Sequence, residues 1–205
     1  GHSKQKLFRI INYWLNQQPP ALSQNHYINA KYIMLDGTYF HKEGCLAIVM
    51  DAVHKLLLDY WYIERENYDN IHPRLITLKH HGLVPQVATL DGHRRVTEAM
   101  RNAWPEILIQ RCLFHIENQG LRWLRTYPKS EAGQTLKTIL KTVTAIQSQT
   151  DQKDFLMTYA NWLQKYSLFI RQLPRTSIVN KDLKRTVSSL SKALPDMFHF
   201  IKDPK

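Results

Sequence analysis

The hydrophobic pattern of residues 31–112 leaves few folds open, because short apolar runs give way to runs that alternate with helical periodicity. Apolar runs separated by brief polar turns are typical of strands, and apolar residues spaced three or four apart are typical of helices. The expected strands cover residues 32–36, 45–50, 57–63, 84–90 and 107–110, and the expected helices cover 73–81 and 93–104. Three antiparallel strands followed by helix, strand, helix and strand predict an α/β fold, a mixed five-stranded sheet with flanking helices.

The flanking sequence is helical in character. Residues 4–16 have the apolar spacing of a helix, and Pro19 and Pro20 after it indicate an extended linker. Towards the other end, the apolar stripes lie over 136–146 and 155–170, with a weaker one over 180–194. Stripes of this kind belong to amphipathic helices that pack against one another.

These patterns predict three parts. Residues 1–30 are expected to form a helical arm and linker, 31–119 the α/β core, and 120–205 an all-α region. The opening Gly1-His2-Ser3 resembles the remnant of a cleaved purification tag, so the chain is expected to be a fragment of a longer protein.

The charge of the chain points to a polyanionic partner. Lys and Arg total 28 against 17 Asp and Glu, a net charge of +11, which favours nucleic acid first and an anionic membrane second. The sequence contains no apolar run of the roughly 18 residues that a membrane span needs, and no signal peptide opens it. Two cysteines are too few for a disulfide scaffold and fit a reducing compartment, so we expect a cytoplasmic protein that does not bind membranes.

Two aspartates are the strongest candidates for chemistry. Asp36 and Asp91 each follow an apolar strand and precede a glycine. If the first and fourth strands are parallel neighbours, the two carboxylates lie close together at one edge of the sheet. Carboxylates held this close repel unless a divalent cation lies between them, and their hard oxygens suit Mg²⁺ or Mn²⁺. The alternative is that each Asp only begins a turn, since Asp-Gly is common there.

A second motif contains Cys112 and His115, three residues apart. Such a pair can bind zinc, but zinc takes about four ligands and no second pair with suitable spacing appears; His41 and Cys45 are too loosely spaced. The spacing alone therefore favours a buried cysteine and a histidine bonded to the main chain over a zinc site.

Two groups of basic residues are candidates for contact with DNA phosphates. His93, Arg94 and Arg95 follow the second aspartate directly. Residues 171–205 carry eight Lys or Arg against three Asp, and Lys181, Lys184 and Arg185 lie at the centre of this stretch. Contacts of this kind do not depend on sequence and weaken with salt. The alternative is a basic face that is only solvated.

Together these motifs resemble a known family. Asp36-Gly37-Thr38-Tyr39, Asp91-Gly92, Trp104-Pro105 and Gln110-Arg111-Cys112-Leu113-Phe114-His115 are similar to the catalytic core of mutator-type DDE transposases of bacterial insertion sequences. The resemblance covers residues 31–118 by motif and 120–200 by helical character alone. In that family a Cys-x-x-His motif follows the second catalytic aspartate, and a helical insertion separates it from a third acid, a glutamate.

The resemblance carries expectations about fold and activity. It implies a ribonuclease H-like fold in which Asp36 and Asp91 hold two Mg²⁺ or Mn²⁺ ions, with zinc not required. The implied function is metal-dependent hydrolysis of DNA phosphodiester bonds and strand transfer during transposition, a form of DNA recombination. Double-stranded DNA, as transposon ends and target, is the implied partner, bound by a homodimer or higher oligomer at the bacterial nucleoid.

The third acid has no obvious place in this sequence. Residues 132–205 contain no glutamate, and Glu98, Glu106, Glu117 and Glu131 have the spacing of solvated or supporting residues. We therefore expect the third acid beyond Lys205 and an inactive fragment. Two other functions stay open: a structure-specific nuclease with a ribonuclease H-like fold, and a domesticated DNA-binding module that has lost catalysis.

Overall fold

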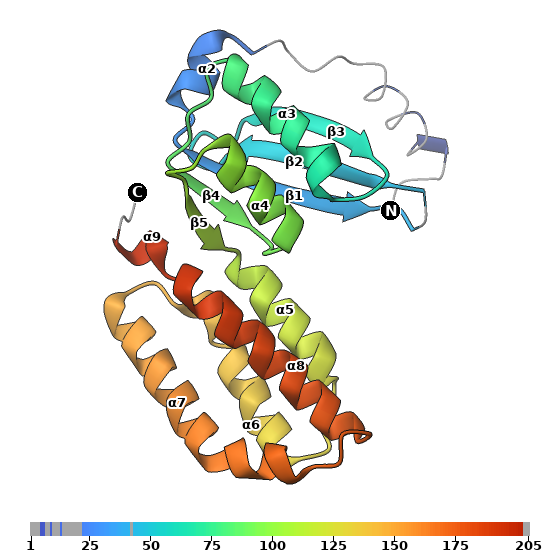
Figure 1. The fold of residues 1–205 in the computed structure, drawn as a ribbon, viewed down its shortest axis with the longest axis vertical. Helices are drawn as coiled ribbons and strands as arrows, with labels where there is room; N and C mark the ends of the chain where they lie inside the picture. Colours follow the sequence, from blue (N-terminus) through green and yellow to red (C-terminus); the bar gives the residue numbers. More distant parts are fainter. Residues whose placement is uncertain (1–4, 7–8, 10–12, 14–21, 42, 203–205) are drawn as a thin grey trace.

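The computed structural model describes residues 5–6, 9, 13, 22–41 and 43–202, which form an α/β unit and a helical unit (Figure 1). Most of the helix expected over 4–16 lies outside these residues. Within the described residues, no helix is long and apolar enough to cross a membrane.

The α/β unit is built on a five-stranded sheet of order β3-β2-β1-β4-β5. Strands β1, β2 and β3 are antiparallel, whereas β4 is parallel to both β1 and β5. The strands are β1 (Tyr32–Tyr39), β2 (Cys45–Asp51), β3 (Leu57–Ile63), β4 (Val87–Leu90) and β5 (Leu108–Arg111). This arrangement confirms the predicted mixed sheet with a ribonuclease H-like order.

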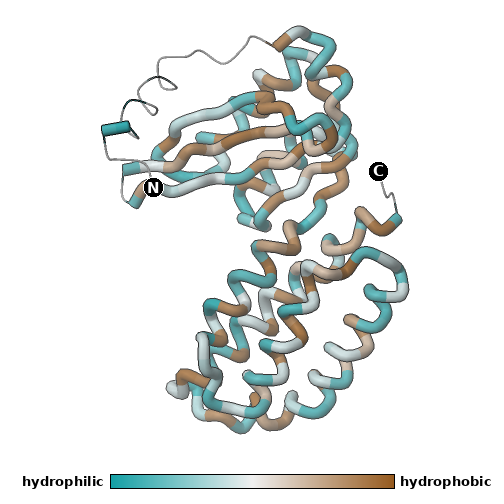
Figure 2. Tube along the Cα trace, turned by 180° about the vertical axis from the view of Figure 1, so that it is seen from behind, coloured by the Kyte–Doolittle hydropathy of each residue, from teal (hydrophilic) through white to brown (hydrophobic). Residues whose placement is uncertain are grey.

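Helices α3 (Tyr68–His80) and α4 (Arg94–Ala103) cover one face of the sheet (Figure 1). Along β1, Ile33 and Leu35 point into the core under these helices, as the alternation of a half-buried strand requires. Side chains on the other face, such as Met34 and Met50, are only partly buried. Figure 2 is turned towards this second face, which we call the open face because α3 and α4 leave it uncovered.

In the α/β unit, three boundaries expected from the sequence were wrong by more than one residue. The first strand runs on to Tyr39, past its expected end at residue 36, because β1 pairs with β2 as far as Tyr39 and Cys45. The first helix begins at Tyr68, not at residue 73, because Asn67 caps it by accepting the N–H of Asn70 at 2.8 Å. Pro73 lies in the second turn of this helix and removes a single main-chain hydrogen bond there. The fourth strand begins at Val87, not at residue 84, since Pro85 has no N–H to donate to a ladder.

The helical unit has its own apolar core. This core is formed by side chains such as Leu136, Leu140, Trp162, Leu183 and Leu190, separate from the core of the sheet. The main helices are α5 (Leu113–Leu124), α6 (Glu131–Leu140), α7 (Gln149–Gln172) and α8 (Ile178–Ala193). The short elements are α2 (Gln24–Asn29), α9 (His199–Lys202) and the 3₁₀ turns η1 (Val143–Ala145) and η2 (Leu194–Asp196). Helix α5 directly follows β5 and runs across residue 119, where we expected the core to end.

A buried glutamine fastens the end of the helical unit to the sheet. The side-chain nitrogen of Gln110, on β5, donates to the carbonyl of Met197 at 2.8 Å. Its oxygen accepts the N–H groups of His199 at 3.0 Å and Phe200 at 3.3 Å. The chain thus leaves the sheet through α5, passes through α6, α7 and α8, and returns to the strand that it left.

Candidate active site

The parallel pairing of β1 and β4 brings the two predicted aspartates to one edge of the sheet. Ile33 pairs with Ala88 and Met34 with Thr89, so Asp36 and Asp91 each come two residues after the last pair of this ladder. Both aspartates line one cavity of about 250 Å³ together with Cys112 and His115. Other lining residues, such as Met34 and Met50, come from the open face, so the candidate site is on that side of the sheet.

The two aspartates are oriented by different local structures. Asp36 lies within β1, paired with Ile48 of β2, so the alternative that it only begins a turn is wrong. It is half exposed, with its Oδ1 accepting the N–H of Gly37 at 2.9 Å. Asp91 follows β4, and its Oδ1 accepts the N–H of His93 at 2.7 Å, the bond that a turn after the strand gives. Both side chains line the shared cavity.

The motif histidine lies beside the first aspartate. His115 Nε2 is 3.8 Å from Asp36 Oδ1, and its Nδ1 is buried without a hydrogen-bond partner among the described residues. Cys112 is the residue before α5 and lines the same cavity. The structure thus brings all four motif residues, two aspartates, a cysteine and a histidine, around one space.

The donor set fits a hard divalent cation. Mg²⁺ is commonly held by one or two carboxylates, with water and substrate phosphates as its other ligands, and Asp36 and Asp91 offer such a pair. Among the described residues, no three His, Cys, Asp or Glu side chains gather closely enough to make a complete protein cage. The geometry therefore suits a metal that is bound jointly by protein and phosphate.

A buried glutamate behind the site escaped the sequence analysis. Glu66, just before α3, is 8% exposed, and its N–H donates to Tyr39 Oη at 3.0 Å. Its carboxyl carbon packs so close to Gly37 that a Cβ there would lie 2.5 Å from it. Burial, followed by the charges of Asp91 and Asp36, raises the pKa of Glu66 to about 7. In the sequence, Glu66 looks like one more charged turn residue.

The raised pKa of Glu66 predicts a pH-dependent stability. Because the pKa of about 7 in the folded protein exceeds the ordinary value of 4.5, the folded state holds a proton that the unfolded chain releases in this range. The contribution of Glu66 to stability is therefore complete below pH 4.5 and is lost as the pH rises to about 7. Glu66→Gln cannot ionise, so at pH 8 it should raise the free energy of unfolding by about 1 to 2 kcal/mol.

Urea unfolding in EDTA at about pH 4 and pH 8 measures this effect. At pH 4 the two proteins should be nearly equal in stability, and the exposed neighbour Glu64, changed to Gln, serves as the matched control. A Glu66→Gln protein that is less stable than wild type at pH 8 would contradict the assignment.

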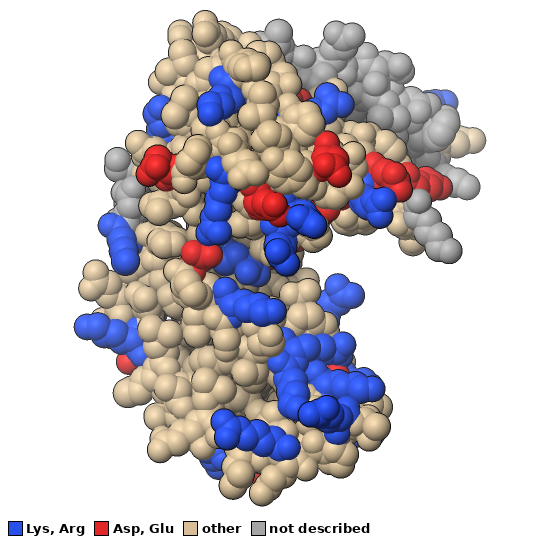
Figure 3. Space-filling view, viewed as in Figure 1, with Lys and Arg blue, Asp and Glu red and all other residues tan. Residues whose placement is uncertain are grey.

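A larger cleft opens from the site towards the helical unit. Its volume is about 550 Å³, and it shares Asp91 and His115 with the smaller cavity. The cations and histidine that line it are His93, Arg111, Arg122, Arg185 and Lys192. Figure 3 shows the hollow between the two units, with Lys and Arg gathered on its helical side. The cleft thus joins Asp91, and through it the cavity that holds Asp36, to a basic surface.

The predicted DNA-binding residues divide between this cleft and the outer surface. His93 and Arg185 line the cleft, whereas Lys181 and Lys184 are on α8 but not among its lining residues. Arg94 and Arg95 begin α4, and Arg95 is paired with Glu98 at 2.9 Å.

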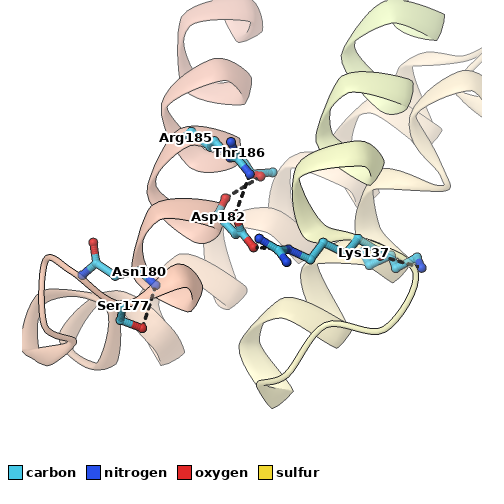
Figure 4. Close-up of polar contacts among 7 residues, drawn as sticks. Lys137, Ser177, Asn180, Asp182, Arg185 and Thr186 are labelled. Atoms are coloured by element: carbon cyan, nitrogen blue, oxygen red, sulfur yellow. Dashed lines mark hydrogen bonds and ion pairs between the residues drawn. The ribbon is translucent and has the colours of Figure 1, made fainter.

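The charge of Arg185 is already partly compensated. Its Nη2 donates to Asp182 Oδ1 at 2.6 Å, and Arg125 Nε contacts the other oxygen of Asp182 at 3.0 Å. Figure 4 shows Asp182 at the centre of this network on α8. The guanidinium of Arg185 also lies over the ring of Trp123, 5.5 Å from its centroid. Arg185 is thus held in place at the rim of the cleft.

The sequence analysis did not single out three other cations of the cleft, and it included Lys192 only as one of the eight basic residues of 171–205. Arg111 ends β5, Arg122 is on α5 and Lys192 on α8. They meet only because α5 and α8 pack together, and no spacing in the sequence signals that contact. Arg111 directly precedes Cys112 in the quoted motif segment, and this position was the one feature of the sequence that pointed to a functional role for it.

Comparison with known proteins agrees with this geometry. A sequence search of curated proteins gives no match. Residues 30–188 match the family described as Transposase, Mutator family. The matched segment is more than half of the chain and contains the whole sheet, both aspartates and the helices up to most of α8. The chain therefore belongs to the Mutator family of transposases.

Proposed function

We propose that this chain is the catalytic core of a DDE-type DNA transposase, which hydrolyses DNA phosphodiester bonds and transfers the freed strand. One observation supports this most: Asp36 and Asp91 line one cavity, and Asp91 also lines the basic cleft beside it. Neither part would suffice alone, since paired carboxylates repel an approaching phosphate and a basic cleft has no means of activating water.

In this proposal, each group of residues has a role that follows from its contacts. Asp36 and Asp91 hold the divalent ions, each aimed by the main-chain N–H that its Oδ1 accepts. When bound, Mg²⁺ or Mn²⁺ supplies Lewis-acid activation of water and of the phosphodiester. His115 lies against Asp36 and limits the orientations of that carboxylate. The cations of the cleft bind the DNA backbone on both sides of the reacting phosphate.

Two further expectations belong to the same proposal. Transposition joins two DNA ends, so we expect two or more copies of the chain in the DNA complex. We also expect the protein to act at the bacterial nucleoid, as the resemblance to insertion-sequence transposases implies. Light scattering of the protein with and without a DNA duplex measures the first of these.

Metal binding tests the proposal without requiring turnover. Calorimetric titration of Mn²⁺ into the protein bound to a DNA duplex should show binding that either Asp36→Asn or Asp91→Asn weakens at least about tenfold, because each change removes an anionic ligand. Asp59→Asn, on β3 outside both cavities, is the matched control and should bind Mn²⁺ as wild type does. Equal Mn²⁺ affinity in all four proteins would contradict the assigned site.

A further inference from the structure

The inner end of the cleft holds an arginine that packs directly against the second aspartate. Arg111 is the last residue of β5, and its Nη2 donates to the main-chain oxygen of Asp91 at 2.9 Å. Gly92 lies flat against the guanidinium, and a Cβ at this position would overlap it. With φ at +93°, Gly92 adopts a backbone conformation that L side chains rarely take. Two properties of glycine thus make room for Arg111.

Arg111 makes no direct ion pair among the described residues, although the charges of Asp91 and Asp196 act on its guanidinium from further away. No carboxylate oxygen there comes within 4.0 Å of its guanidinium, and its Nε is buried without a hydrogen-bond partner. Burial lowers the pKa of Arg111, although an arginine keeps its charge in proteins. A partly desolvated cation with an unused N–H is costly unless an anion arrives to compensate it.

The other arginine of the cleft with described contacts differs in this respect. Arg185 has its charge compensated by Asp182 and its plane held by Trp123. Arg111 instead lines a cleft that opens to solvent, next to Asp91, and its guanidinium makes no direct ion pair there among the described residues. Arginine is well suited to such a position, since its planar donors match the oxygens of a phosphate.

We propose that Arg111 binds a DNA phosphate beside the Asp36–Asp91 pair, and that residue 92 must be glycine to leave space for its guanidinium. The phosphate supplies the direct ion pair that Arg111 lacks and accepts from the guanidinium N–H groups that face the cleft. Because the main chain of Asp91 fixes the guanidinium, the bound phosphate lies at a set place relative to the carboxylates. This inference rests on the proposed function, since it assigns one contact within the DNA complex.

Salt-dependent DNA binding tests the contact. Fluorescence anisotropy of a labelled DNA duplex gives the affinity of wild type, Arg111→Gln and Arg111→Lys over a range of salt concentrations. Removing one phosphate contact should reduce the slope of log affinity against log salt by about 0.9 and weaken binding about tenfold near 0.1 M salt. Lysine keeps the positive charge but lacks the planar pair of N–H donors of the guanidinium. Arg111→Lys should therefore keep the slope of log affinity against log salt and lose about threefold in affinity.

The matched control is Arg74→Gln, which removes an exposed cation from α3 outside the cleft. This control should bind within about twofold of wild type, with an unchanged slope. Arg111→Gln with the affinity and slope of wild type would overturn the inference and leave the proposed function standing. If Arg111→Gln does not fold, Arg111→Lys decides, because wild-type affinity in that variant also overturns it. A wild-type protein that binds the duplex without salt dependence would instead refute the proposed function.

Discussion

Replacing Asp36 or Asp91 by asparagine is expected to abolish Mg²⁺-dependent DNA cleavage, by at least about 10³-fold or 4 kcal/mol of transition-state stabilisation. Asparagine keeps the oxygen that accepts the N–H of Gly37 or His93, so the local backbone should be unchanged. What it removes is the negative charge that holds the cation. DNA affinity should stay within about twofold of wild type, because the cations of the cleft are untouched.

The measurement is nicking of a supercoiled plasmid by a form of the transposase that carries all three acids implied by the family resemblance. Asp59→Asn serves again as the control and should cleave normally. EDTA should stop cleavage by wild type, and added Mg²⁺ should restore it. Cleavage at the wild-type rate by either asparagine variant would show that the paired aspartates are not the metal site.

The strands of the sheet and their order could be predicted because each strand is marked by residues that are close together in the sequence. Each strand of 31–112 is a short apolar run with turn residues at its ends, and the alternation of Ile33 and Leu35 with more polar neighbours already marks a half-buried strand. The start of α3 was not open to prediction in this way. It depends on Asn67, whose capping bond to Asn70 gives no apolar signal, while Pro73 suggests a boundary that the helix passes through.

The residues of the candidate site also differ in whether the sequence could predict them. Asp36 and Asp91 could be expected together because parallel strands end at one edge of a sheet. Glu66 could not, since it reaches the site by packing against Gly37 after the chain has folded. Arg122 and Lys192 are on different helices and meet only through the packing of α5 and α8. Sequence patterns report on neighbours within an element, and these contacts join separate elements.

The junction between the two units rests on a residue that the sequence analysis treated only as part of a motif. Gln110 is 6% exposed and joins β5 to the segment that follows α8. The basic cleft lies between α5, α8 and the edge of the sheet, so its shape depends on where α8 ends. The Gln110 side chain therefore supports the cleft without lining it.

Replacing Gln110 by alanine should lower the free energy of unfolding by about 3 kcal/mol, because it leaves buried main-chain groups unpaired at about 1 to 3 kcal/mol each. The groups that lose their partner are the carbonyls of Met197 and Arg111 and the N–H groups of His199 and Phe200. For a chain of 205 residues, a loss of this size corresponds to a melting temperature lower by about 6 to 12 °C.

Thermal and urea unfolding measure this loss, with Gln86→Ala as the matched control. Gln86 is exposed and precedes β4, and its removal should change the stability by less than about 0.5 kcal/mol. Gln110→Glu keeps an acceptor for the two N–H groups but loses the donor to Met197, so its stability should fall between those of wild type and Gln110→Ala. Equal stability of Gln110→Ala and Gln86→Ala would mean that the helical unit is held to the sheet by its apolar contacts alone. The cleft between them would then owe its shape to packing and not to this polar junction.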